Sequence, residues 1–354
     1  MDLSFKKTFY ALACAAAILT LIYFGRPILM SLTIALLLSF ILYPVVQKLE
    51  SWKLPRVTSA ILTLVIIVTS IVGIFYLFGS QIMNVMEELS NFEKKLSEMS
   101  NEVVLFINKH LSIMPSIDGK DILDNGAKWV QESGGEIVKG TVSRTSAIIS
   151  GIMIVIVYTF LLLIYRSGLK RVIIESAPKK HHETVAKMLA EMQQVGQKYL
   201  FGMSIMILIL GIANSTALLI IGVDHAFFFG FLAGLLAIIP YVGTTIGAGI
   251  PVLYTLMTYD DYLTPLLVIV TFWVIQLVES NFLSPKIVGG NMNINALAAI
   301  LSLLIGGYLW GVGGMVLFLP LAAIFKVFCG YFNQLKPVGL LLGDQLYENK
   351  KAKS

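Results

Sequence analysis

The sequence predicts an all-α polytopic membrane protein with about eight apolar helical segments, two of them broken and open to interpretation as re-entrant. Of 354 residues, 57% are hydrophobic and only 13% are charged, whereas soluble domains carry roughly 25% charged residues. Apolar runs recur along almost the whole chain, and the mean hydropathy is +0.83. Because backbone polar groups must be paired within hydrocarbon, runs of ~17–25 apolar residues become spanning helices.

The first three transmembrane helices are expected within residues 1–78. A basic start at Lys6 and Lys7 precedes an apolar run at 8–24, as in a signal peptide, but no small-residue cleavage site follows. We therefore expect a retained hairpin with the next run, 28–46, in which Gly25-Arg26-Pro27 makes the turn and Pro27 opens the second helix. A basic loop at 47–56 then leads into the run 57–78.

The fourth helix, 146–165, is followed by a basic amphipathic segment at 166–200. That segment carries seven lysines and arginines against three glutamates, so the positive-inside rule places it in the cytoplasm. Counting back through four spans places the N-terminus and the loop 47–56 there too. We expect the cytoplasmic (inner) membrane, both termini in the cytoplasm, and a basic face of 166–200 on lipid or on the helix bundle.

Residues 79–145 become an extracytosolic amphipathic helical insert in this topology. They carry ten acidic and seven basic residues. Apolar residues follow a heptad, which predicts a partner helix. The partner is either the later piece Ile122–Val142 or the same helix of a neighbouring subunit. The heptad positions are Ile82, Val85, Leu89, Phe92, Leu96, Met99, Val103 and Phe106.

The transport core is expected at 201–335, before a basic cytoplasmic tail at 336–354. After a fifth span, 201–221, two apolar tracts, 226–258 and 296–330, flank another span, 263–282. The tracts have 33 and 35 residues, so straight helices would be ~50 Å long against a ~30 Å hydrocarbon core. Each tract must tilt, break or fold back. The breakers in their middles are Pro240, Gly243 and Pro251 in the first, and Gly311, Gly313, Gly314 and Pro320 in the second.

Broken helices expose backbone dipoles, and paired interrupted segments often mark a transporter's binding site. Close packing through small residues is the alternative explanation. If both tracts are re-entrant, Asp260 and Asp261 lie outside and Lys286 inside; if both cross, the reverse holds. The positive-inside rule favours re-entrance, through that single lysine.

Glu279 is the one acid inside the run 263–282, and an unpaired charge there is costly unless it faces a cavity or partner. It could carry a proton or sodium ion, or instead pair with Lys286 near the run's end. Gln276 shares its helix face, and Asn281 would join if the helix unwinds before Pro285. Tyr241 and Asn214 are further polar candidates in the same half of the chain.

Three motifs resemble the autoinducer-2 exporter family of permeases: IPYVG at 239–243, ESNFLSPKIVG at 279–289, and GVGGM at 311–315 before Pro320. The likeness extends along almost the whole chain. It implies eight helices, a bacterial or archaeal cytoplasmic membrane and homo-oligomers, a pentamer among them. It also implies export of autoinducer-2 or other small molecules, with sodium/proton antiport in some members. Family members often have His-Pro where this chain has Asn295-Ala296, which weakens proton coupling by analogy.

We therefore expect a secondary carrier that moves a small polar molecule or ion, with an ion or small-solute channel as the alternative. The glycine breaks could line a pore. An enzyme is not expected, because the sequence shows no nucleophile–base pair, and the four histidines form no metal-binding set. No cofactor or metal is expected beyond a coupling sodium ion or proton. The expected partners are membrane lipid, the small-molecule or ion substrate and further copies of the chain, but no nucleic acid.

Overall fold

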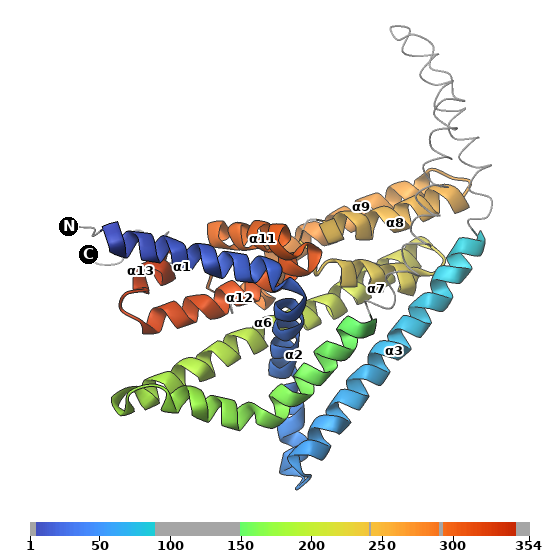
Figure 1. The fold of residues 1–354 in the computed structure, drawn as a ribbon. Helices are drawn as coiled ribbons and strands as arrows, with labels where there is room; N and C mark the ends of the chain where they lie inside the picture. The colour runs from blue at the N-terminus through green and yellow to red at the C-terminus, as the bar shows by residue number, and fades with distance from the viewer. Residues whose placement is uncertain (1–4, 89–148, 241, 290–292, 345–354) are drawn as a thin grey trace, which may run out of the picture.

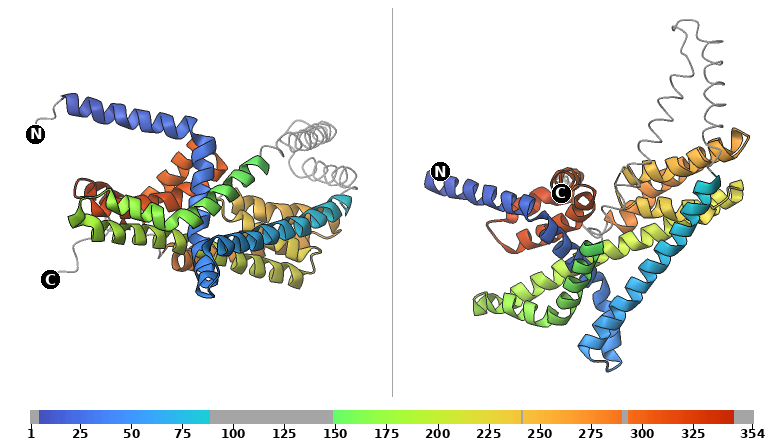
Figure 2. Two further views of the ribbon diagram at one scale, coloured as in Figure 1. Left: turned by 60° about the horizontal axis from the view of Figure 1, so that its bottom comes forward. Right: turned by 45° about the vertical axis from the view of Figure 1, so that its right-hand side comes forward.

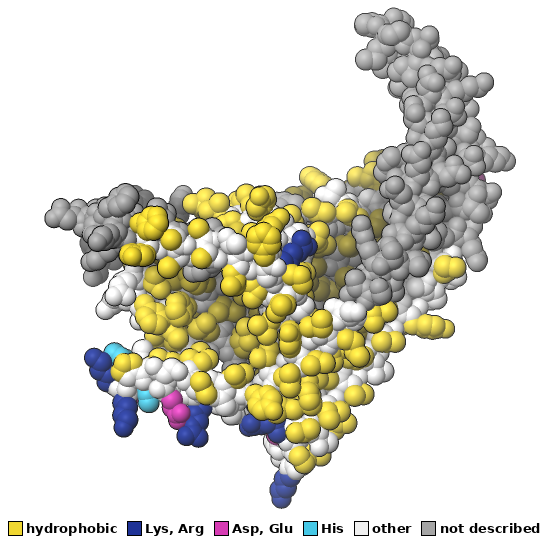
Figure 3. All heavy atoms as spheres, in the orientation of Figure 1, with side chains coloured by type: hydrophobic (Ala, Val, Ile, Leu, Met, Phe, Trp, Pro, Cys, Tyr) yellow, Lys and Arg dark blue, Asp and Glu magenta, His cyan; other side chains and the backbone are white. Residues whose placement is uncertain are grey.

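The computed structural model describes residues 5–88, 149–240, 242–289 and 293–344 (Figure 1). Within these ranges the chain is almost entirely helical, with one isolated bridge between Ile294 and Gly343. Six described helices are long and apolar enough to cross a membrane. Hydrophobic side chains cover much of the face shown in Figure 3, and lysines and arginines gather along its lower edge. The all-α polytopic fold class is confirmed.

The first two helices meet at an elbow. α1 (Phe5–Phe24) and α2 (Arg26–Ser51) are separated by Gly25 alone, and both figures show them at a wide angle (Figures 1 and 2). The expected hairpin at 8–46 is therefore wrong. A single residue between two helices is too short to reverse the chain. The Gly25 amide donates to the carbonyl of Leu21, and the Gly25 carbonyl accepts from the amide of Leu29, so helical hydrogen bonding continues through this residue.

α3 (Arg56–Glu88) and the helix Ile149–Glu175 pack beside α2. Their shared core contains Leu42 and Val46 of α2, Leu64 of α3 and Leu163. α3 continues ten residues beyond the expected end at 78, and its last described turns contact the residues that follow α6. The heptad beyond Glu88 lies outside the described residues, so its partner stays a prediction.

Among the described helices, α6 (His182–Ile221) is the longest, with 40 residues. The basic segment 166–200 is therefore not separate: it holds the end of one helix and the first half of α6. At ~1.5 Å per residue, α6 is about 60 Å long. Later helices pack along both of its halves.

The tract 226–258 folds back on itself as α7 (Ala226–Leu236) and α8 (Val242–Thr258). Gly243 lies against the carbonyl of Leu236 and Gly247 against Ala233, and the rings of Phe229 and Tyr254 are 4.8 Å apart. These pairs run from the turn outward, so the helices are antiparallel. We call this unit hairpin one.

The tract 296–330 does the same as α11 (Ala296–Trp310) and α12 (Val312–Tyr331), which we call hairpin two. Gly311 makes the break with φ of 66°, a region that favours glycine. Gly306 and Gly314 touch backbone to backbone. Both tracts are therefore hairpins of half-helices, and the interpretation as single tilted crossings is wrong.

The two hairpins pack on opposite halves of α6. Hairpin one lies on the second half, where Gly230 meets Ser215 and Gly234 meets Gly211. Hairpin two lies on the first half, where Ile324 meets Gly196 and Tyr331 is hydrogen-bonded to Glu191. α6 thus connects two hairpins whose bases lie at opposite ends of the molecule (Figure 1).

The span between the hairpins is one continuous rod: α9 (Leu263–Val278), a π-helical turn η3 (Glu279–Leu283) and α10 (Ser284–Ile287). Asp261 accepts the amide of Thr264 at its start, 2.6 Å away, and this bond holds the pKa of Asp261 below its ordinary value. The short helix α13 (Lys336–Leu342) follows hairpin two and packs against α12 and α11.

Candidate functional site

The widened turn at Glu279–Leu283 is the first element of the site. Pro285 has no N–H to offer the carbonyl of Asn281, so the regular ladder cannot continue there. Single π-helical turns of this kind are frequent at functional sites. The helix widens before Pro285 but does not unwind, so the condition on which Asn281 would join Glu279 is not met.

Glu279 lies half-buried at the start of this turn. Gln276 Nε2 donates to its carboxylate over 2.6 Å, and the hydroxyl of Ser284 is hydrogen-bonded to the same carboxylate. Glu279 forms no ion pair with Lys286, although both residues are described, so the alternative of an interfacial pair between them is wrong. The structure thus brings together Glu279, Gln276 and Ser284, the last of which the sequence reasoning did not include.

Asn281 does not join this group. Its Nδ2 donates to the carbonyl of Leu277 over 2.8 Å, and its side chain is exposed. Tyr241 lies outside the described residues. Asn214 lies in the middle of the second half of α6, buried with 5% of its surface exposed. Its Oδ1 and the Oγ of the adjacent Ser215 have no hydrogen-bond partner among the described residues, which is costly for buried polar atoms.

The tip of hairpin one contacts the C-terminal end of the rod formed by α9, η3 and α10. Ala237 belongs to the same core as Tyr199 and Met206 of α6 and Leu283 of η3. A Cβ at Gly202 would lie 2.6 Å from the carbonyl oxygen of Ile287, so α6 and α10 approach backbone to backbone. The Pro240–Gly243 break, Pro285 and the Glu279 turn therefore gather around the middle of α6. Pro251 lies farther along α8, fully buried.

The break in hairpin two lies elsewhere. A Cβ at Gly311 would be 3.6 Å from the guanidinium of Arg26, and Gly313 packs on Met30. The expectation that both tips meet the span 263–282 is therefore wrong for this tip: Gly311 and Gly313 face the α1–α2 elbow, while Gly314 packs on Gly306 and Trp310 within the hairpin. Farther along α12, Pro320 is fully buried, while the neighbouring Leu319 reaches the core around η3.

A clasp joins this break to the elbow. Arg26 Nη2 donates to the carbonyl of Trp310 over 3.1 Å, and Trp310 Nε1 donates to the carbonyl of Ile22 over 3.2 Å. The sequence reasoning treated Arg26 only as a turn residue. A cation between two apolar runs was the available signal, because such residues usually have a partner.

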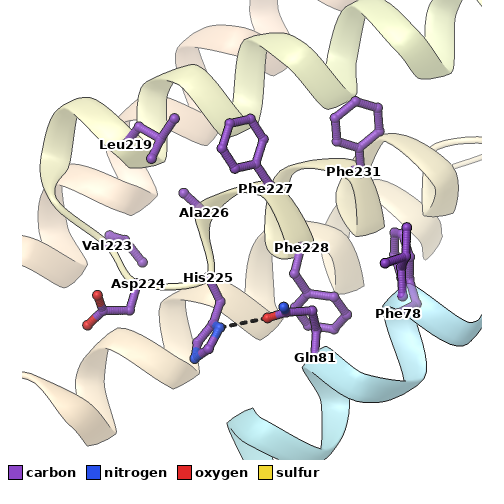
Figure 4. A pocket seen from close by; sticks show the side chains of 11 residues that line it. Phe78, Gln81, Leu219, Val223, Asp224, His225, Ala226, Phe227, Phe228 and Phe231 are labelled. Atoms are coloured by element: carbon purple, nitrogen blue, oxygen red, sulfur yellow. Dashed lines mark hydrogen bonds between the residues drawn. The ribbon is translucent and has the colours of Figure 1, made fainter. Parts of the chain in front are cut away.

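A cavity of about 520 Å³ lies where α3 meets the turn between α6 and α7 (Figure 4). Its walls are mostly apolar, with Phe78, Phe227 and Phe231 among them. Its polar lining residues are Asp224 and the pair in which His225 Nδ1 lies 2.8 Å from Gln81 Oε1. Such a space fits an apolar or aromatic group with one polar end. Sequence reasoning missed it because α3 and α7 are far apart in the chain.

No group of three or more His, Cys, Asp or Glu side chains suited to a metal ion occurs in the described part of the chain. A single carboxylate with amide and hydroxyl neighbours, as at Glu279, is instead suited to a proton or a weakly held monovalent cation.

Comparison with known proteins gives consistent matches. The family model described as "AI-2E family transporter" matches residues 12–334. The Bacillus subtilis protein named "Putative transport protein YrrI" is 26% identical, over 88% of each chain. The Escherichia coli protein named "AI-2 transport protein TqsA" is 24% identical, over 96% of each chain.

Proposed function

Since the chain belongs to the AI-2E transporter family, we propose that this multi-pass membrane transporter is a secondary carrier of a small polar molecule or ion. An autoinducer-2-type signal is one candidate substrate, because TqsA carries that name. In this proposal the carrier exports its substrate across the cytoplasmic membrane, and export is coupled to a sodium or proton gradient. The carrier works as a homo-oligomer.

The observation that carries this proposal is the pair of antiparallel hairpins on opposite halves of α6. Discontinuous helices form the binding site in many secondary transporters, and alternating access there is largely the rocking of one repeat against the other. Hairpin one, whose tip lies beside the Glu279 turn, is the moving part nearest the polar group. Hairpin two is held at its tip by the Arg26–Trp310 clasp.

Glu279 is the coupling group in this mechanism. An ionised carboxylate within hydrocarbon resists movement, so binding a proton or sodium ion would permit the hairpin to rock past it. Gln276 and Ser284 position the carboxylate through their hydrogen bonds. Transport is then coupled to binding of the ion or proton, because moving the ionised Glu279 carboxylate without it carries a large desolvation cost.

The test is flux into liposomes that contain the purified protein, with candidate substrates and imposed sodium or proton gradients. Glu279→Gln should abolish the gradient dependence and lower coupled flux by at least tenfold, because the amide cannot gain or lose the charge. Glu183→Gln, at the exposed start of α6, is the matched control and should keep coupled flux. Unchanged gradient dependence in Glu279→Gln would reject Glu279 as the coupling group.

A further inference from the structure

A small pocket lies at the base of hairpin two, away from Glu279. It has a volume of about 240 Å³ and is lined by the end of α12, by α13 and by the residue that follows α13. Its lining residues are Lys326, Gly330, Lys336, Gly339, Leu340 and Gly343. Two of the six are cationic and three are glycines, and most of the surface that lines the pocket is apolar.

The two lysines differ in their surroundings. Lys326 is half-buried, donates to the carbonyl of Asn293 and is attracted by the nearby carboxylate of Asp344. Lys336 is exposed, and its ammonium group has no hydrogen-bond or ion-pair partner among the described residues. With Asp344 offsetting Lys326, the pocket retains about one net positive charge.

The surface beside the pocket is apolar. Leu340 and Leu341 of α13 are 51% and 56% exposed, and Phe325 of α12 is 48% exposed. Such side chains on a helix that ends a membrane hairpin are suited to acyl chains. The pocket therefore adjoins both a hydrocarbon-facing surface and a cationic group. This combination is expected of a phospholipid-binding site and not of a site for a free solute.

We propose that this pocket binds the phosphodiester headgroup of an anionic phospholipid of the cytoplasmic leaflet, with the acyl chains along Phe325, Leu340 and Leu341. The single negative charge of such a headgroup matches the net charge of the pocket. The leaflet rests on the proposed orientation, in which the lysine-rich start of α6 faces the cytoplasm. Tyr331, one residue from the pocket, is hydrogen-bonded to Glu191 in that half of α6.

Lipid bound here would hold the base of hairpin two. Asn295 caps α11 by accepting the amide of Ala298 over 2.8 Å. The same side chain donates to the carbonyls of Leu341 and Gly343, 2.7 and 3.0 Å away. A ligand that fixes α13 therefore also fixes the first turn of α11. Anionic lipid becomes a structural partner of this hairpin.

The test is equilibrium binding of fluorescent short-chain phosphatidylglycerol to the purified full-length protein in neutral detergent, with the phosphatidylcholine analogue as reference. Phosphatidylglycerol should bind more tightly. Lys336→Gln should weaken its binding about fivefold, the effect expected for one lysine near an anionic lipid surface. Lys336→Arg should retain binding, and Lys180→Gln, on another exposed lysine, should leave it unchanged.

Gly330→Leu tests the cavity without changing charge. A Cβ at Gly330 meets nothing within 4 Å, so the protein should fold while the longer side chain fills the pocket and weakens binding. Equal binding of both lipids, or an unaffected Lys336→Gln variant, would overturn the proposal. Competition by millimolar inorganic phosphate would overturn the lipid assignment in favour of a soluble anion. Because the readout is binding, it is independent of whether the carrier mechanism is correct.

Discussion

Single side chains hold the end of the molecule where α2, α3 and the helix Ile149–Glu175 meet. Glu50 forms an ion pair with Arg166 and lies 3.6 Å from Arg56. Arg166 also lies over the ring of Tyr43, 5.1 Å from its centroid. The Glu50 and Arg166 side chains are only about one-fifth exposed, at 22% and 18%. Removing one charge from such a group leaves an oppositely charged partner that is partly desolvated and no longer paired.

We predict that Glu50→Gln lowers the free energy of unfolding by about 1–3 kcal/mol, less than for a fully buried pair because solvent still screens it. Thermal unfolding in detergent measures this change. Glu175→Gln removes an exposed i,i+4 pair with Arg171 and should leave the free energy of unfolding nearly unchanged, because solvent screens exposed pairs. Equal costs for the two variants would show that the Glu50 cluster is no more than a surface pair.

At the scale of elements, the two hairpins were predictable and their contacts were not. Excess length with glycines and prolines at mid-tract indicated folding back, because both signals are local. The contact of Gly311 with Arg26 joins residues 285 positions apart and leaves no periodic pattern. The same applies to Ser284, whose role depends on a widened turn, and to the cavity between α3 and α7.

The turn of hairpin one depends on Gly243. A Cβ there would overlap the carbonyl oxygen of Leu236, whereas a Cβ at Gly249 in the same helix would meet nothing within 4 Å. We predict that Gly243→Ala destabilises the protein by roughly 1–3 kcal/mol through overpacking. Gly249→Ala should instead stabilise α8 by up to about 1 kcal/mol. Thermal unfolding of the two variants side by side checks this, and similar midpoints would contradict the tight turn.

At the scale of the whole molecule, the bases of the hairpins lie at opposite ends of α6. Asp260 follows hairpin one, and Lys286 precedes hairpin two. If α6 crosses the membrane, the hairpins open toward opposite faces. The positive-inside rule then places Lys286 in the cytoplasm and Asp260 outside.

We predict that a cysteine at Asp260 reacts with an impermeant maleimide from outside in intact cells, and one at Lys286 only after permeabilisation. The background needs Cys14→Ser and Cys329→Ala, because both native thiols are free. Ser176→Cys, in the basic segment, is the cytoplasmic control. Labelling of Lys286→Cys in intact cells would reverse the orientation, and labelling of both positions from one side would reject hairpins of opposite direction.

The clasp between the elbow and hairpin two can form only late in synthesis of the chain. Arg26 and Trp310 are separated by 284 positions. At bacterial synthesis rates of roughly 5–20 residues per second, Trp310 is made about 15–60 s after Arg26. During that interval the guanidinium lacks its native acceptor and must be solvated by water, lipid phosphate or the insertion machinery. Docking of α1 against α11 is therefore a late event of biogenesis, completed only when nearly the whole chain has been translated.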